Sequence, residues 1–224
     1  MKQTIPFLCV FFVISSCIEI LDDITFNLDG SGTFRYTLNL SSSQVKINSI
    51  LALDSLDGNK VPSLEEIQQK IIFFREHLGA QEGISNVQID TNYAQYIFKV
   101  NCDFINVSAL QSGFQNSLRA TFTKIENEEM SYDWITWNGN VMMRKVPDID
   151  KMTLPSFKSE ESDLLKKGNY TSITRFENHV DSCDNPNAIL SKNKKAVMLR
   201  ESVFDVMNHH KVMDNIIYVD STSK

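Results

Sequence analysis

The sequence lacks the residues and patterns that mark several classes of protein. Eight glycines and five prolines among 224 residues are too few for a fibrous or low-complexity chain. Basic charge is also short: 22 lysines and arginines stand against 28 acids, and this net charge of −6 argues against a nucleic-acid-binding surface. After the first apolar run, no stretch approaches the roughly 18 apolar residues that predict a transmembrane helix. The 42% of hydrophobic residues is enough for a packed core.

The amino-terminal segment has the pattern of a secretory signal peptide. Lys2 supplies a positive charge, and an uninterrupted apolar run occupies residues 5–14. Ten residues of helix rise about 15 Å, whereas the hydrocarbon core of a bilayer is about 30 Å thick, so this run is too short to span it. Ser15 and Ser16 follow as small residues. The pattern predicts that residues 1–16 are removed during export.

The residues at the expected cleavage point resemble the lipobox of bacterial lipoproteins. Ile14, Ser15, Ser16 and Cys17 present a branched apolar residue, two small residues and a cysteine. The resemblance implies that signal peptidase II cleaves before Cys17 and that its sulfur carries diacylglycerol. Two or more acyl chains anchor a protein stably where one does not. Ile18 stands where inner-membrane lipoproteins often carry aspartate, which implies an outer-membrane location on the periplasmic or cell-surface side.

Two cysteines remain for the mature domain once Cys9 is removed and Cys17 is acylated. Cys102 and Cys183 leave two alternatives open. In an oxidising compartment they could form a disulfide that closes a loop of about 80 residues and contributes about 4 kcal/mol. In the other alternative, Cys102 is a small core residue on the apolar phase of a strand, and Cys183 is a separate thiol in a polar loop. The pattern slightly favours separate thiols.

Alternation and capping patterns predict the first elements of the mature chain. Two period-two apolar runs, at residues 18–28 and 33–40, flank the turn sequence DGSG and predict a β-hairpin. Ser63 and Glu66 have the spacing of a capping box, and apolar residues follow at helical spacing as far as Leu78. We therefore expect a helix over this segment.

The rest of the chain predicts further strands and helices within one domain over residues 17–224. In order, these are a short helix at 45–53, strands at 83–89 and 96–104, a helix capped by Asn106 or Ser108, a hairpin around Asn138-Gly139, a polar connector at about 147–168, and strands at 169–177, 187–190, 196–200 and 215–220. This succession predicts an α+β fold: a meander of antiparallel hairpins with two or three helices packed on one face.

These elements together resemble a broad group of uncharacterised bacterial envelope lipoproteins. Members have a hairpin with a DGSG turn soon after the lipidated cysteine, as in ITFNLDGSGTFRYTLNL of this chain. The segments GISNVQID, YIFKVNCDF and NPNAILSKNKKAVML also match the pattern of the group. The resemblance implies an extracytoplasmic α+β domain at a membrane surface and supplies no catalytic residues.

Few residues of the sequence have spacings that suggest catalysis or metal binding. Ser43 and Lys46 fit the S-x-x-K pair of penicillin-binding enzymes, but the companion K-T-G and S-D-N elements are absent from the sequence. His179, Asp181, Cys183 and Asp184 lie close in sequence, yet they would come from one irregular loop, which is a poor source of a zinc site. We predict no metal, no cofactor and no enzymatic activity.

The predicted role is a non-catalytic structural or binding module of the cell envelope. Its expected partners are the membrane, through the lipid anchor, and an unknown envelope protein or amphiphile. Trp137 lies beside a turn and off the strand phase of Trp134, so we expect it to be exposed and a candidate ligand contact. The alternative is a lipid- or amphiphile-binding or transfer protein, which requires a half-open apolar cavity. A hydrolase, the third reading, requires serine, histidine and acid groups to converge.

Overall fold

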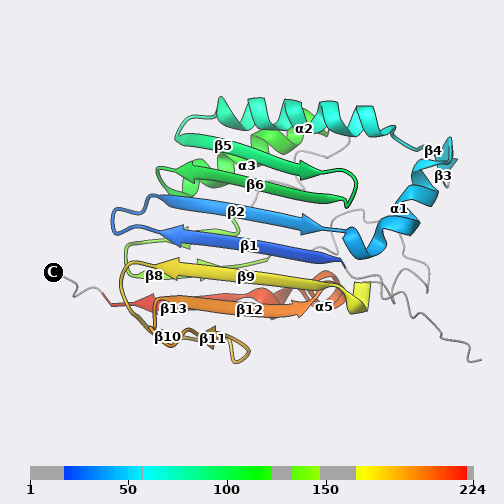
Figure 1. The fold of residues 1–224 in the computed structure, drawn as a ribbon. Coiled ribbons are helices and arrows are strands. Elements are labelled where there is room, and N and C mark those ends of the chain that lie inside the picture. The colour runs from blue at the N-terminus through cyan, green and yellow to red at the C-terminus, as the bar shows by residue number, and fades with distance from the viewer. Residues whose placement is uncertain (1–17, 57, 123–132, 147–164, 221–224) are drawn as a thin grey trace, which may run out of the picture.

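The computed structural model describes residues 18–56, 58–122, 133–146 and 165–220, which form two main β-sheets and a layer of helices (Figure 1). The fold is α+β, as predicted. In Figure 1 the larger sheet faces the viewer, and the smaller sheet lies behind its lower part. None of the helices in this part of the chain combines the length and the apolar character that crossing a bilayer requires.

The larger sheet has seven strands in the order β11-β12-β9-β1-β2-β6-β5. Strands β1 and β2 form the predicted hairpin, with Ile24 opposite Phe34. The strand bounds are β1 Glu19–Phe26, β2 Gly32–Asn39, β5 Ile84–Asn92, β6 Ile97–Phe104, β9 Asn169–Phe176, β11 Ile189–Leu190 and β12 Ala196–Ser202. β1 therefore lies in the middle of the sheet, between β2 and β9.

One strand pairing differs from the antiparallel meander predicted from the sequence. β1 and β9 are parallel, with Asp22 opposite Ser172, whereas every other neighbouring pair of this sheet is antiparallel. Parallel strands need a long crossover connection, and here β2 to β8 lie between the two strands in sequence. Period-two alternation is the same in both directions, so it could not reveal this pairing.

The DGSG sequence forms the turn between β1 and β2. The backbone N–H and the hydroxyl of Ser31 donate to Oδ1 of Asp29 at 3.0 and 2.6 Å. Gly30 has a φ of +84°, a conformation that favours glycine. A Cβ atom at Gly32 would lie 1.9 Å from the carbonyl oxygen of Thr25, so no side chain fits there. The motif is explained by backbone geometry.

A second sheet of four strands covers the half of the large sheet formed by β1, β9 and β12. Buried Met142 and Ile217 of this sheet pack in one core with Val197 of β12. The predicted turn at Asn138-Gly139 joins β7 to β8. The order is β10-β13-β8-β7, with bounds β7 Ile135–Trp137, β8 Val141–Arg144, β10 Val180–Cys183 and β13 Asn215–Val219.

Two helices cover the other half of the same sheet face. In Figure 1, α2 (Leu64–Gly79) follows the β5 edge, and α3 (Val107–Thr121) lies behind β5 and β6. The predicted capping box begins α2: Ser63 Oγ accepts from the N–H of Glu66 at 3.1 Å, and the Glu66 carboxylate accepts from the N–H of Ser63 at 2.7 Å. Asn106 caps α3. Helices on one face are thus confirmed, but they share that face with the second sheet.

Smaller elements complete the described part of the chain. The predicted short helix after β2 is α1, none of whose residues is buried. The bounds of these elements are η1 Ser41–Ser43, α1 Gln44–Leu51, β3 Ser55–Leu56, β4 Asn59–Lys60, α5 Val203–Asn208 and η3 His210–Met213. β3 and β4 pair as a two-stranded hairpin. Figure 1 places α1 and this hairpin at the end of the molecule where β1 begins.

Candidate ligand-binding cavity

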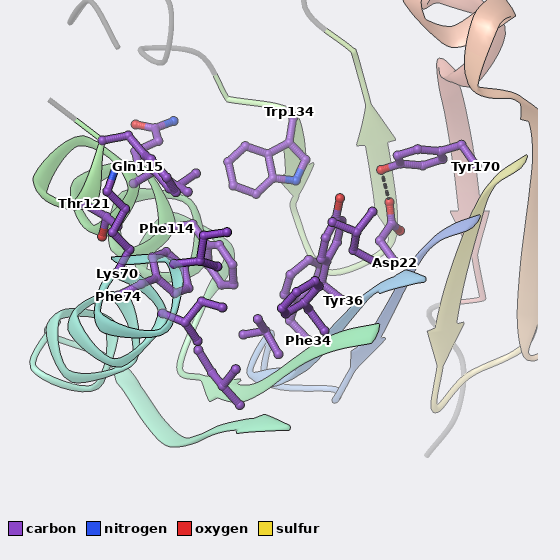
Figure 2. Close-up of a pocket in the computed structure, with 18 of the residues that line it drawn as sticks. Asp22, Phe34, Tyr36, Lys70, Phe74, Phe114, Gln115, Thr121, Trp134 and Tyr170 are labelled. Carbon is purple, nitrogen blue, oxygen red and sulfur yellow. Dashed lines mark hydrogen bonds between the residues drawn. The ribbon is translucent and has the colours of Figure 1, made fainter. Parts of the chain in front are cut away.

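A cavity of about 710 Å³ lies between the two helices and the large sheet (Figure 2). Fourteen of its 21 lining residues are apolar. Strands β2, β5 and β6 provide the floor, helices α2 and α3 form one wall, and Trp134 lies across from the floor. The volume is within the range of about 300–1,000 Å³ typical of small-molecule sites.

The floor of the cavity follows from strand alternation. Phe34, Tyr36 and Leu38 are alternate residues of β2, so their side chains point to one face, and all three line the cavity. Val100 of β6 lies opposite Tyr36, and Ile89 of β5 lies opposite Val100. The three strands therefore present one continuous, mainly apolar surface to the helices.

The wall of the cavity follows from helical spacing. Ile71 and Phe74 of α2 are three residues apart and share a face, as do Phe114 and Leu118 of α3, four residues apart. The Phe114 ring packs edge-on against Phe74 at 5.9 Å and against Phe34 at 5.1 Å. These ring contacts join the two helices to the sheet, and Ile71 and Leu118 line the space beside them.

A buried ion pair forms the polar end of the cavity. Asp22 of β1 is 3% exposed and Arg144 of β8 is 5% exposed. Arg144 donates from Nη1 and Nη2 to the two carboxylate oxygens of Asp22 at 3.1 and 3.0 Å. Ser172 Oγ and the Tyr170 hydroxyl donate to the same carboxylate at 2.8 and 2.5 Å. The carboxylate thus accepts four hydrogen bonds, and the pair links the two sheets.

Burial and the charge of Asp22 together fix the protonation of its neighbours. Burial is the largest single influence on Arg144 and acts to lower its pKa, but the charge of Asp22, the Tyr170 phenol and the hydrogen bonds to both together outweigh burial, so that pKa is raised above its ordinary value. Burial, and then the same charge, raise the pKa of Tyr170 well above its usual range. At neutral pH Arg144 is therefore charged and Tyr170 is a hydrogen-bond donor. A buried pair that is fully hydrogen-bonded avoids the large penalty of an isolated buried charge.

Tyr36 lies where the polar end meets the apolar floor. It is opposite Asp22 in the β1–β2 register. Burial, followed by the charge of Asp22, raises the pKa of Tyr36 to about 12, so the phenol is neutral at physiological pH. Within the described part of the chain its hydroxyl has no hydrogen-bond partner. It can therefore donate to a polar group of a ligand in the cavity.

Lys70 adds a positive charge to the lining of the cavity. Its side chain is exposed, and its Nζ lies 5.3 Å from the centre of the Phe122 ring, within the range of a cation–π contact. Both residues line the cavity. An exposed cation beside apolar walls is suited to an anionic group attached to an apolar chain.

Trp137 does not line this cavity, and it is less exposed than the sequence predicted. It is half-buried and stacks on Phe26 at 5.1 Å and on Phe176 at 5.6 Å. The prediction was wrong about exposure because β7 begins at Ile135, so the inward phase of the strand is that of Ile135 and Trp137. Trp134 precedes the strand, and it is the tryptophan that lines the cavity.

Cys102 and Cys183 both carry free thiols in the structure. Cys102 is fully buried on β6, and burial followed by the charge of Asp103 raises its pKa to about 12. Cys183 is half-buried at the end of β10, which pairs with β13. The prediction that Cys183 lies in a polar loop was therefore wrong. Burial and then the charge of Asp184 raise the pKa of Cys183 as well. Both thiols are therefore mainly protonated at neutral pH.

The other candidate residues lie away from the cavity or outside the described residues. The described residues contain no group of three or more His, Cys, Asp or Glu arranged to hold a metal ion. Ser43 is buried, whereas the Lys46 side chain is exposed to solvent. The predicted signal peptide, Cys17 and residues 147–164 of the predicted connector fall outside the part of the chain that the structure describes.

The sequence analysis missed the ion pair, although the sequence contains a signal for it. Asp22 interrupts the apolar phase of β1 between Ile20 and Ile24. Arg144 follows buried Met142 on the inward phase of β8. Opposite charges on the inward phases of two strands indicate a buried pair, because a lone buried charge is costly. The separation of the two residues in sequence hides their contact.

Comparisons with known proteins give little beyond this geometry. No protein-family model matches the chain, and no curated protein matches it in sequence. Among solved structures, the NMR structure of the folded domain of the Mycobacterium tuberculosis LppM protein is similar over 100% of this chain and 99% of that one. The sequences are 11% identical and the TM-score is 0.43. A likeness this distant supports no inference about function.

Proposed function

We propose that this protein is a membrane-anchored bacterial lipoprotein that binds the apolar chain of an amphiphile in the cavity beneath α2 and α3. The observation that carries the proposal is the cavity itself, a space of about 710 Å³ with a mainly apolar lining. Of the functions predicted from the sequence, amphiphile binding is the one that requires such a space. The lipobox-like residues ending at Cys17 support anchoring, and Ile18 supports an outer-membrane location.

The chemistry of the lining supports a ligand with one apolar and one polar part. An acyl chain would lie between the floor at Val100 and the wall at Ile71 and Leu118, where it replaces water at apolar surface. Lys70 would bind an anionic headgroup at the exposed side, and the Tyr36 hydroxyl would donate to an ester or carboxyl oxygen.

We further propose that the role is binding without catalysis. Asp22 and Arg144, the charged groups at the inner end, hold one another in a buried, fully hydrogen-bonded pair. Tyr170 is likewise engaged by its hydrogen bond to Asp22. A general acid or base must exchange a proton with substrate, and the raised pKa values of Arg144 and Tyr170 oppose such exchange near neutral pH.

A titration with a fluorescent fatty acid tests the proposal. The Cys17→Ser form, which cannot be acylated at that position, is mixed with cis-parinaric acid, whose emission rises in apolar surroundings. We expect saturable binding by the unaltered domain. Leu118→Trp places a larger side chain in the cavity wall and should weaken binding about tenfold or more, because the added volume excludes the chain.

Ile189→Trp is the matched control. Ile189 is 56% exposed on β11, at the opposite edge of the sheet from β5, so the same added side chain leaves the cavity unchanged. Binding by this variant should equal that of the unaltered domain. Failure of the unaltered domain to bind the probe, or equal binding by Leu118→Trp and Ile189→Trp, would overturn the proposal.

Anchoring is tested separately by mass spectrometry of the protein purified from its own envelope. We expect a chain that begins at Cys17 and carries the mass of its acyl groups. An intact Met1, or an unmodified Cys17 sulfur, would remove the anchor and the outer-membrane location from the proposal, while the cavity titration would stand unaffected.

A further inference from the structure

Large apolar side chains are exposed together at the end of the molecule where β1 begins. Val45 of α1 is 69% exposed, Leu53, just before the β3–β4 hairpin, is 47% exposed, and Leu56, in that hairpin, is 41% exposed. Leu64, the first residue of α2, is 39% exposed. Figure 1 shows α1 and the β3–β4 hairpin projecting beyond the end of the large sheet. We name these four residues the apolar tip.

The expected lipid anchor, Cys17, lies two residues before the start of β1, at this end of the fold. The carbonyl oxygen of Ile18 accepts from the N–H of Asn169 at 2.7 Å, and Glu19 accepts from the side chain of Asn39 at 2.9 Å. The chain is therefore held in the sheet from the residue immediately after Cys17. Consecutive Cα atoms are about 3.8 Å apart, so no flexible tether can separate the lipid from the domain.

The charge of the tip also suits a membrane surface. Residues 45–64, which span the apolar tip, contain two lysines and two aspartates, so their formal charge is zero in a chain of net charge −6. Glu65 and Glu66 follow in α2, and Glu66 pairs with Lys60 at 2.7 Å. An acidic surface is repelled by anionic lipids, whereas a neutral one is not. The other exposed large apolar residues of the described chain lie outside the tip: Leu28, Ile72, Phe73, Ile105, Phe122, Ile189 and Tyr218.

We infer that the apolar tip is a membrane-contacting surface that inserts into the interface of the bilayer holding the Cys17 lipid. Amphipathic surfaces bury apolar side chains at the boundary between headgroups and acyl chains. The cavity reaches this end, since its lining includes Pro62, which lies between β4 and α2, and Leu38 near the end of β2. An amphiphile could then enter the cavity directly from the bilayer. The inference depends on the proposed anchor at Cys17 and not on ligand binding.

Site-specific fluorescence on the acylated full-length mature protein tests the inference. Cys183→Ser removes the half-buried thiol, Cys102 is buried, and Cys17 is blocked by its lipid. Val45→Cys is then labelled with an environment-sensitive nitrobenzoxadiazole dye and reconstituted into vesicles of phosphatidylcholine and phosphatidylglycerol. We expect a blue-shifted emission that lipids carrying a shallow nitroxide quench several-fold more strongly than at the control position.

Leu28→Cys is the matched control. Leu28 is 59% exposed, comparable to Val45, but it lies in the β1–β2 turn at the opposite end of the sheet. Equal emission and quenching at the two positions, or a dye at residue 45 that remains water-exposed, would overturn the inference. The cis-parinaric acid titration uses protein without vesicles, so a failure of ligand binding and a failure of membrane contact are read out independently.

Discussion

The two halves of the inner face of the large sheet are packed in opposite ways. Where β9 and β12 face the second sheet, one space of about 10 Å³ lies between them, about the least that a single water molecule occupies. Where β2, β5 and β6 face the helices, the space is about 710 Å³. Both halves use the same strand alternation. The difference lies in what covers them: a second sheet interdigitates with the first, whereas α2 and α3 leave the floor between them uncovered.

The boundary between the halves is the Asp22–Arg144 pair, and breaking it should have the largest effect. Arg144→Met leaves the Asp22 carboxylate buried without its counter-ion and should lower the free energy of unfolding by about 3–5 kcal/mol. Urea denaturation measures this loss. The double variant Asp22→Leu/Arg144→Met removes both charges and should recover most of it. A loss below about 1 kcal/mol in Arg144→Met would mean that the pair does not hold the sheets together.

Truncations on either side of the boundary should differ in cost. Met142→Ala in the packed half removes a fully buried side chain and should cost about 2–5 kcal/mol. Leu118→Ala removes a side chain that already faces the cavity, so it loses fewer contacts and should cost about 1–2 kcal/mol. Denaturation of the ligand-free variants compares them. Equal costs would contradict the contrast between a packed and an uncovered half.

Alkaline pH should reveal the burial of Tyr36 on the cavity side. Its folded pKa of about 12 lies above the unfolded value near 10, so the fold favours the neutral phenol. The contribution of the neutral Tyr36 phenol to the free energy of unfolding is fully present below pH 10 and is lost as the pH rises towards 12. At pH 11 the unaltered protein should have lost about 1 kcal/mol of stability that Tyr36→Phe retains. Unfolding free energies of both proteins between pH 8 and 11.5 provide the measurement, and parallel curves would place the phenol in solvent.

Local patterns in the sequence were sufficient to predict most elements of the fold. The capping box at Ser63 fixes the start of α2, and the glycines of the DGSG turn fix the β1–β2 hairpin. These predictions succeeded because each rests on contacts within a few residues. The parallel β1–β9 pair rests on distant contacts and has no such signal.

The cavity could be anticipated only as a possibility, because its lining has the same periodicity as a packed core. Phe34 and Leu38 alternate like any buried strand residues, and Ile71 and Leu118 have ordinary helical spacing. Whether such residues meet or leave a space depends on how far the helices stand from the sheet. The error at Trp137 has a related cause, since its burial depends on Phe26 and Phe176, which are remote in sequence.

The central place of β1 has a consequence for how the protein folds. Its partner β9 begins at Asn169, so the strand next to the expected anchor cannot be enclosed on both sides until about three quarters of the chain has been delivered. Sheets built from such distant pairings form slowly. During the proposed export, β1 would therefore gain its second neighbour only after β9 has emerged, so the sheet would close around its first strand late.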